Sequence, residues 1–441
     1  MQYEARHGWW VIGVMVVIFL IFIPLSVALG VRYDYTLTTV AVGGALLGAV
    51  SGMLGTFTVL RKESLMGDAL SHAALPGIAI AFLIAGRQLG WLLVGAGIAG
   101  WLGAQGIRVI TNTTRLKQDA AMGIILTTFF ALGLTFLSFI QQLPDASQAG
   151  LDQFIFGQAA AIVRRDVELI IIVGILALLG VLLFWKEFKL VTFDREFAGA
   201  NGYPVQILDL LLSTLIVVAI VLGLQIAGVI LMVGMLIAPA VAARQWTHHL
   251  GQMTILSMMF GAFSGASGAV ISGIDTGLPT GPIIITVAFI LVFISLLLAP
   301  ERGLLWAWWR RLQDRRRFAA INVLIDIYRH ACQHDNPHYP APEGYLRALR
   351  GPIAKTGIYY LHKAGLIHRV GEDKWALTDR GEAAAIHEDR NRLLWALYRQ
   401  HSEALNLPSV REEREIDIRH RLPEDAVSQL EALADKRNVE L

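Results

Sequence analysis

The chain has 441 residues, of which 55% are hydrophobic and 16% charged, and its mean hydropathy is +0.55. This composition excludes intrinsic disorder, a disulfide-rich secreted scaffold and a purely soluble enzyme, and the net charge of +2 favours no class of partner. Residues 1–300 hold 14 basic and 14 acidic side chains, which leaves 23 of the 37 basic and 21 of the 35 acidic side chains for the last 141 residues. We therefore expect a membrane part followed by a soluble part. The one cysteine, Cys332, excludes an internal disulfide and fits a reducing compartment.

Apolar runs of about 20 residues, the length that crosses a bilayer, recur along the membrane part. They predict an all-α polytopic membrane protein with nine or ten transmembrane helices. The number is open because only Leu224 and Gln225 separate two of the runs. The first run lacks a small-x-small cleavage site, which favours a retained helix over a signal peptide. The expected spans are residues 9–29, 39–60, 69–85, 89–110, 120–140, 166–185, 206–223, 226–243, 250–273 and 280–299.

Basic residues between these spans predict the orientation of the chain. With the N-terminus in the cytoplasm, the inner connections hold ten Lys or Arg side chains and the outer connections hold four, as the positive-inside rule requires. Both termini are then expected to be cytoplasmic. The inner set is Arg6, Arg61, Lys62, Arg108, Arg115, Lys117, Lys186, Lys189, Arg195 and Arg244, and the outer set is Arg32, Arg87, Arg164 and Arg165.

The sequence divides into four expected parts. Residues 1–38 contain an additional first helix and an outer loop, and residues 39–300 form the transmembrane domain. Residues 301–317 combine tryptophans with a run of arginines, which is typical of a linker at the membrane interface. In residues 318–441, helical periodicity is followed by two short strands that turn at Gly371 and by a further helix. This order predicts a cytoplasmic winged-helix (α+β) domain.

One expected span carries an acidic side chain and a histidine. Asp68 and His72 are four residues apart, so on a helix they share a face, and their carboxylate and imidazole suit a divalent first-row metal. An ionisable group inside a span costs about 2.5–3.5 kcal/mol on insertion scales, which favours metal or proton handling. The structural alternative is that the two side chains only pair with each other, or that Asp68 caps its helix. Pro76 and Gly77 are expected to loosen the helix just beyond the pair.

The segment around this pair, GTFTVLRKESLMGDALSHAALPG at residues 55–77, closely resembles the signature of the permease subunits of manganese, zinc and iron ABC importers, the metal ABC-3 type. The resemblance covers residues 39–300. It implies a subunit that assembles with a second permease copy or a paralogue, a cytosolic ATPase dimer and an extracytoplasmic metal-binding protein. Three further stretches match in the family's order: FIFGQ at 154–158, FDREFA at 193–198 with Gly202 after it, and GVILMVGMLIAPAVA at 228–242.

The same resemblance implies roles for individual residues. Asp68 and His72 match the coordinating pair of the translocation path, and two pairs from two subunits would form a four-ligand site. Nitrogen and oxygen donors suit Mn²⁺, Fe²⁺ or Zn²⁺ rather than Cu⁺. Asp275 lies in an outer loop where the family carries an acidic residue; it is a weaker candidate for the metal path than for turn chemistry. The residues implied in coupling to the ATPase are Asp194, Arg195 and Glu196; without the resemblance, an ordinary charged inner loop would be the preferred interpretation.

The soluble part resembles a second family more weakly. GPIAKTGIYYLHKAGLI at 351–367 and WALTDRGEAA at 375–384 look like the winged helix of DtxR-type metal-dependent repressors. Those repressors carry a metal-binding histidine where this chain has Asn391, which argues against a high-affinity metal sensor. The near balance of basic and acidic residues gives no footprint for DNA. Protein contact by dimerisation, docking or gating is therefore favoured over metal sensing, and nucleic acid binding is not expected.

Several other polar residues have structural explanations. Asp209, near the start of an expected span, is interpreted as a helix-terminus group, and His248 and His249 as members of a solvated inner loop. Histidines at four-residue spacing could hold a metal on a helix, but the break at Asn336 and Pro337 favours a loop there instead. These histidines are His330, His334 and His338.

We predict that the chain is the transmembrane permease of an ATP-driven importer of Mn²⁺, with Zn²⁺ or Fe²⁺ as alternatives, in a bacterial inner membrane. It is not expected to be an enzyme or to keep a cofactor, because the metal is its cargo and no Gly-x-x-x-x-Gly-Lys-Ser/Thr motif occurs to hold ATP. Two alternatives remain: a proton- or sodium-coupled secondary transporter, in which Asp68 carries the proton, and a membrane-tethered metal-responsive regulator.

Overall fold

The computed structural model describes residues 2–28, 33–86, 88–142, 164–274, 278–300, 302–405, 407–410 and 417–439. The chain divides into two compact units, Met1–Trp306 and Ala307–Leu441. The division falls inside the stretch of residues 301–317 that the sequence predicts to be a linker.

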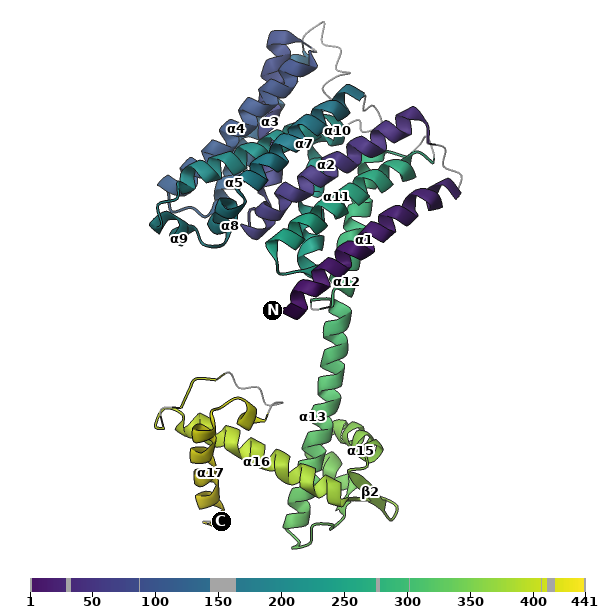
Figure 1. Ribbon diagram of the computed structural model, residues 1–441, viewed down its shortest axis with the longest axis vertical. Helices are drawn as coiled ribbons and strands as arrows, with labels where there is room; N and C mark the ends of the chain where they lie inside the picture. The colour runs from purple at the N-terminus through teal and green to yellow at the C-terminus, as the bar shows by residue number, and fades with distance from the viewer. Residues whose placement is uncertain are drawn as a thin grey trace. The chain divides into compact units, whose positions relative to one another are not determined.

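The first unit is a bundle of long apolar helices (Figure 1). In the part of the chain that the structure describes, eight helices are long and apolar enough to cross a membrane. A helix pairs its own backbone groups, as hydrocarbon requires. All described helices of the first unit, the short ones included, are α1 (Gln2–Ala28), α2 (Tyr35–Leu60), α3 (Met66–Ala85), α4 (Leu89–Thr113), α5 (Gln118–Gln141), α7 (Arg164–Leu183), α8 (Trp185–Phe193), α9 (Arg195–Ala200), α10 (Val205–Trp246), α11 (Leu250–Ser272) and α12 (Thr280–Leu298).

Two of the predicted spans are not among these eight helices. Helix α1 has 27 residues, and in its described part the apolar stretch runs from Trp10 to Phe22. Among the described residues of α10, Val205–Leu224 is long and apolar enough to be a span. Gly228 has φ 74° and ψ 172° and breaks the helix there, a conformation that glycine adopts readily and other residues do not. The break lies close to the predicted division after Leu224, and the number of nine or ten spans stays a prediction.

Small residues bring α2 and α11 into backbone contact. A Cβ atom added at Gly48 would lie 2.1 Å from the carbonyl oxygen of Gly261, and the reverse substitution would give 2.0 Å. The Ser257 hydroxyl donates a 2.6 Å hydrogen bond to the carbonyl of Gly52. The four-residue spacing of these small side chains thus serves packing within the chain, as is common for helices in lipid.

The helix that bears Asp68 and His72 is packed in the same close manner. A Cβ atom added at Gly77 of α3 would lie 2.0 Å from the carbonyl oxygen of Gly95 in α4. On α5, a Cβ atom at Gly133 would lie 2.7 Å from Cβ of Leu75 and 3.2 Å from the ring of Pro76. Helix α3 is therefore fixed by glycine contacts about one turn beyond His72.

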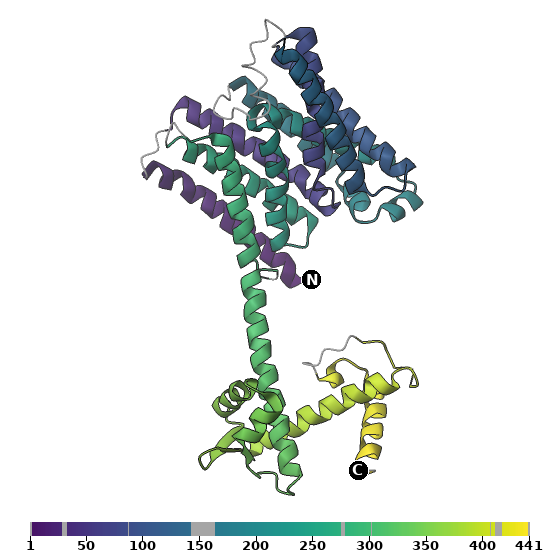
Figure 2. The ribbon, with the colours of Figure 1, turned by 180° about the vertical axis from the view of Figure 1, so that it is seen from behind.

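The second unit combines helices with a three-stranded antiparallel sheet of order β1-β3-β2 (Figure 2). Gly371, with φ 73°, lies in the turn between β2 and β3, so the hairpin predicted from the sequence is confirmed. Its elements are α13 (Leu304–Cys332), which starts before the unit boundary, β1 (Ala341–Pro342), α14 (Glu343–Arg350), α15 (Ile353–Lys363), β2 (Ile367–Val370), β3 (Lys374–Leu377), α16 (Asp379–His401), η3 (Ile418–His420) and α17 (Glu424–Val439).

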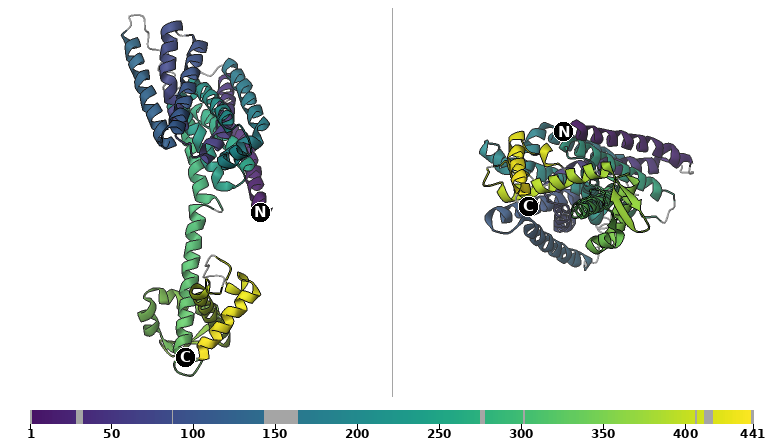
Figure 3. Two further views of the ribbon diagram at one scale, coloured as in Figure 1. Left: turned by 90° about the vertical axis from the view of Figure 1, so that its left-hand side faces the viewer. Right: turned by 90° about the horizontal axis from the view of Figure 1, so that it is seen from below.

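Two separate apolar cores stabilise this unit, and α16 contributes to both. Figure 3 shows the ribbon from two further directions. The first core lies among α13, α14, α15, the sheet and the start of α16, with Val323 and Leu377 fully buried. The second lies among the later part of α16, η3 and α17, around Leu394 and Leu430. Beside the first core, Asp326 accepts hydrogen bonds of 2.6 and 2.9 Å from Arg350, and these bonds raise the pKa of Arg350.

Gly48→Ala tests the contact between α2 and α11. The new methyl group must push the helices apart, and overpacking of this kind destabilises by about 1–3 kcal/mol. We expect a lower midpoint of thermal unfolding for the purified chain in detergent. Gly97→Ala in α4 is the matched control, because a Cβ atom there meets nothing within 4 Å. Equal midpoints for the two variants would contradict the contact.

Candidate functional site

The predicted pair lies near the start of α3. Asp68 is in the first turn, where a negative charge is favoured by the helix dipole, and His72 follows one turn later. The His72 Nε2 atom is 3.4 Å from Oδ1 of Asp68. The two side chains therefore share a face of the helix, as their spacing predicts.

In the described part of the chain, one ring nitrogen of His72 has no hydrogen bond. Its ring meets Phe130 of α5 edge-on at a centroid distance of 4.7 Å, and its side chain is 22% exposed. Among the described residues, Nδ1 of His72 has no hydrogen-bond partner although it is buried, and the buried hydroxyl of Ser71 is in the same situation. An unpaired buried polar atom costs about 1–3 kcal/mol, so it calls for an explanation such as a ligand.

The pair alone does not complete a metal site. Within the residues that the structure describes, no group of three or more His, Cys, Asp or Glu side chains is placed to hold a metal ion. Asp68, with 37% of its side chain exposed, has an open side that another ligand can approach. Asp275, the further predicted metal-path residue, and the FIFGQ motif at 154–158 lie outside the described residues. Among the described residues, Asp68 and His72 are thus the two donor side chains at this place.

The residues predicted to couple to an ATPase lie at the short helix α9. Asp194 caps this helix, since its Oδ1 accepts a 2.9 Å hydrogen bond from the Phe197 amide. Arg195 forms an ion pair with Asp209 of α10, and Glu196 is exposed in the first turn. The structure therefore brings one of the three predicted residues into contact with the long helix α10.

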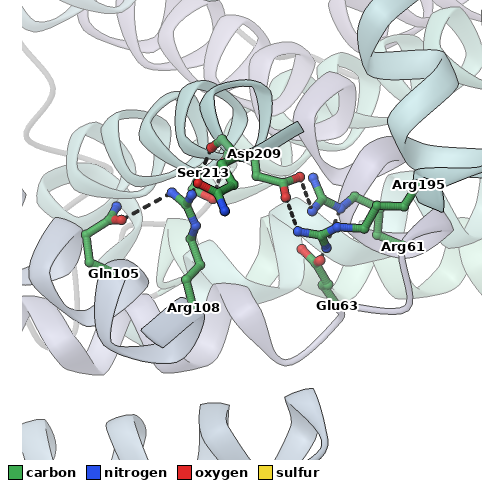
Figure 4. Close-up of polar contacts among 8 residues, drawn as sticks. Arg61, Glu63, Gln105, Arg108, Arg195, Asp209 and Ser213 are labelled. Atoms are coloured by element: carbon green, nitrogen blue, oxygen red, sulfur yellow. Dashed lines mark hydrogen bonds and ion pairs between the residues drawn. The ribbon is translucent and has the colours of Figure 1, made fainter. Parts of the chain in front are cut away.

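Asp209 is the residue whose importance the sequence analysis missed. It is near a helix start, as interpreted, but its side chain is 3% exposed and also accepts a 2.7 Å hydrogen bond from Arg61 (Figure 4). Arg61 in turn donates to Glu63 at 3.0 Å. An acidic residue inside an apolar segment is a signal to look for a partner, but the sequence does not show which arginines reach it.

The other candidate histidines are held in structural contacts. His248 Nδ1 is 3.1 Å from Arg302. In the second unit, the His330 and His334 rings lie 4.7 Å apart, and His334 stacks on Tyr339. Burial, together with repulsion from His334, lowers the pKa of His330. His338 instead contacts the carbonyl of Leu377 at 3.0 Å, so the three histidines of the four-residue series do not converge.

The fold and the pair define the class of the protein as a polytopic, mostly helical membrane protein with a polar site in one of its spans. The particular family follows from sequence comparison. Residues 32–299 match the model described as the ABC 3 transport family, which is more than half of the chain. The chain belongs to this family.

Individual relatives agree with that membership. The manganese transport system membrane protein MntC of Bacillus subtilis is 38% identical over 89% of this chain and 90% of its own length. The zinc transport system membrane protein TroC of Treponema pallidum is 48% identical over 63% of this chain and 94% of its own length. The solved structure of PsaBC from Streptococcus pneumoniae in complex with Fab has a chain that is 32% identical, with a TM-score of 0.55 over 64% of this chain and 97% of that chain.

The different coverages locate what is shared. A match over 89% of this chain has to extend beyond Trp306, so the Bacillus protein shares sequence with the second unit. The Treponema protein is matched over 94% of its length by 63% of this chain. The relatives therefore differ in whether their match includes the second unit.

Substitutions at the pair test its capacity to bind metal. We expect Asp68→Asn and His72→Gln each to weaken Mn²⁺ binding to the purified permease assembly by about tenfold or more, because loss of even a supporting contact costs 10–100-fold at metal sites. Isothermal titration calorimetry measures the change. Glu168→Gln is the control, since this exposed carboxylate of α7 pairs with Arg164. Unchanged affinity in both variants of the pair would place the metal elsewhere.

Proposed function

We propose that the chain is the permease subunit of an ATP-driven importer of divalent transition metal, with Mn²⁺ as its main cargo and Zn²⁺ or Fe²⁺ as alternatives. Membership of the ABC 3 transport family supports a transport role that needs a separate ATPase. Manganese is favoured because the Bacillus relative, which matches over both units, is named for manganese transport.

The observation that carries this proposal is the acid–imidazole pair of α3. Asp68 supplies oxygen, His72 supplies nitrogen, and Nδ1 of His72 is free of a hydrogen bond among the described residues. Such a set without thiolate suits Mn²⁺, Fe²⁺ and Zn²⁺. Two ligands per chain also fit a cargo that has to be released again, because a transient site must bind weakly.

Four ligands are obtained when two subunits contribute one pair each. The second subunit is either a further copy of this chain or a paralogue. A metal delivered on the outside by an extracytoplasmic binding protein is received by Asp68 and His72, and closure of the ATPase dimer opens the path to the inside. This is alternating access around a fixed site between membrane-embedded subunits.

The proposed orientation places both termini in the cytoplasm of a bacterial cell and the multi-pass unit in its inner membrane. It follows from the excess of Lys and Arg on one side of the expected spans. Helix α9, with Asp194, Arg195 and Glu196, then lies on the cytoplasmic side, where the ATPase binds. Its charged side chains suit a contact of this kind.

For the second unit we propose a winged helix of the DtxR-repressor type that has lost repressor function. The order of helices followed by the β2–β3 hairpin and α16 supports the fold. Asn391, at the position of a repressor ligand, is 3% exposed and accepts a 3.0 Å hydrogen bond from the Ile418 amide, which is a structural role. Ile353 and Tyr359 of α15 are 60% and 62% exposed, which suits a protein contact better than a DNA groove.

The importer is tested by reconstitution. Proteoliposomes that contain this chain, its ATPase and its binding protein should accumulate ⁵⁴Mn²⁺ when ATP is supplied, and Asp68→Ala should reduce the uptake to background because the path loses a ligand. Competition with Zn²⁺ and Fe²⁺ ranks the cargoes. Uptake that a pH or sodium gradient drives without ATP would instead identify a secondary transporter. Glu168→Gln serves as the control for reconstitution.

A further inference from the structure

We infer that a buried ion-pair network passes movement from α9 to the start of α3, and that Asp209 is the positioning residue at its centre. The inference rests on the proposed function, which gives α9 its contact with the ATPase and α3 its metal. Four side chains from three places in the sequence form the network (Figure 4): Arg61, Glu63, Arg195 and Asp209.

Asp209 holds the network together because both of its oxygens are used. Oδ1 accepts from Arg61 at 2.7 Å, and Oδ2 accepts from Arg195 of α9. With only 3% of the side chain exposed, little water can replace either arginine. Loss of a partner from a buried carboxylate strongly destabilises the folded protein. The positions of the two arginines therefore depend on each other through Asp209.

The ion pair between Arg61 and Glu63 fixes the turn between α2 and α3. Arg61 is the C-cap residue of α2, and its Nε atom donates to Glu63, whose side chain is 6% exposed. Between them Lys62 has φ 61°, a backbone conformation that is strained for a residue other than glycine and persists only where its surroundings hold it. The ion pair that spans Lys62 supplies this constraint, since it joins the residues on its two sides.

This turn leads directly into the metal pair. The Glu63 carbonyl accepts a 2.9 Å hydrogen bond from the amide of Met66, the first residue of α3. Met66 also lines a small cavity of about 40 Å³ together with all four network residues. Asp68 is two residues further along the same helix. A displacement of the turn therefore changes the position of the carboxylate proposed to bind metal.

The other end of the network is accessible to a partner. The Arg195 side chain is 53% exposed, whereas the side chains of Arg61, Glu63 and Asp209 are at most 12% exposed. A protein that binds α9 can hold Arg195 on Asp209 or draw it away, and these are two discrete arrangements. A partner with different affinity for the two arrangements shifts their populations, which is what coupling between two sites requires.

Hydrogen exchange of the full chain in nanodiscs tests the connection without reference to transport. Arg195→Gln removes a charge on α9, and we expect about three- to tenfold faster exchange at the amides of Glu63 and Met66, in the range that coupling residues give. Arg108→Gln is the matched control: Arg108 lines the same cavity but donates to Gln105 and to the Gln206 carbonyl. Equal exchange in the two variants would overturn the inference.

Transport measurements separate a coupling role from a purely structural one. In the reconstituted importer, Asp209→Asn and Arg195→Gln should lower the metal transported per ATP hydrolysed by about three- to tenfold, with Asp209→Glu closer to the parent. The double variant should lose little more than either single variant, because both remove the same connection. A lower yield of folded protein, with an unchanged ratio of metal transported to ATP hydrolysed, would show a structural role and overturn the inference. A parent chain without ATP-dependent uptake would refute the proposed function, while hydrogen exchange still decides the connection.

Discussion

The pairing of buried charge is the constraint on which the membrane unit depends. A charged group in a low-dielectric interior destabilises the folded state unless it has a partner. Asp209 satisfies this need with two arginines and is almost fully buried. In the described part of the chain, Asp68 pairs with His72 alone, at 3.4 Å, and keeps an open side. The first acid connects helices, and the second retains the capacity to take a ligand from outside its own chain.

Backbone contacts complement these charges. The facing glycines of α2 and α11, and those of α3 and α4, bring main chains so close that a methyl group does not fit. Such pairs behave as rigid elements, because sliding would force carbonyl oxygens against Cα atoms. We therefore expect access to the metal site to change by movement of helix pairs and of the α2–α3 turn, and not by deformation within a pair.

Local patterns were predictable, and distant pairings were not. The spans of the membrane unit, the shared face of Asp68 and His72, and the β2–β3 hairpin depend on spacing within a few turns of chain. Asp209 and Arg61 are 148 residues apart, and no periodicity connects them. The sequence predicts an interfacial linker at residues 301–317, and α13 runs through most of it and on to Cys332 without a break, since its arginines are compatible with a helix. The break at Gly228 was visible only as uncertainty in the span count.

The most direct test of the account is to identify the ligand atoms of the cargo. Electron spin-echo envelope modulation of Mn²⁺ bound to the assembled permease detects coordinated histidine nitrogen. The account predicts a nitrogen signal that disappears in His72→Gln and persists in His249→Gln, where the histidine precedes α11. A nitrogen signal that survives the loss of His72, or bound Mn²⁺ without any nitrogen ligand, would contradict the claim that metal passes through the α3 pair.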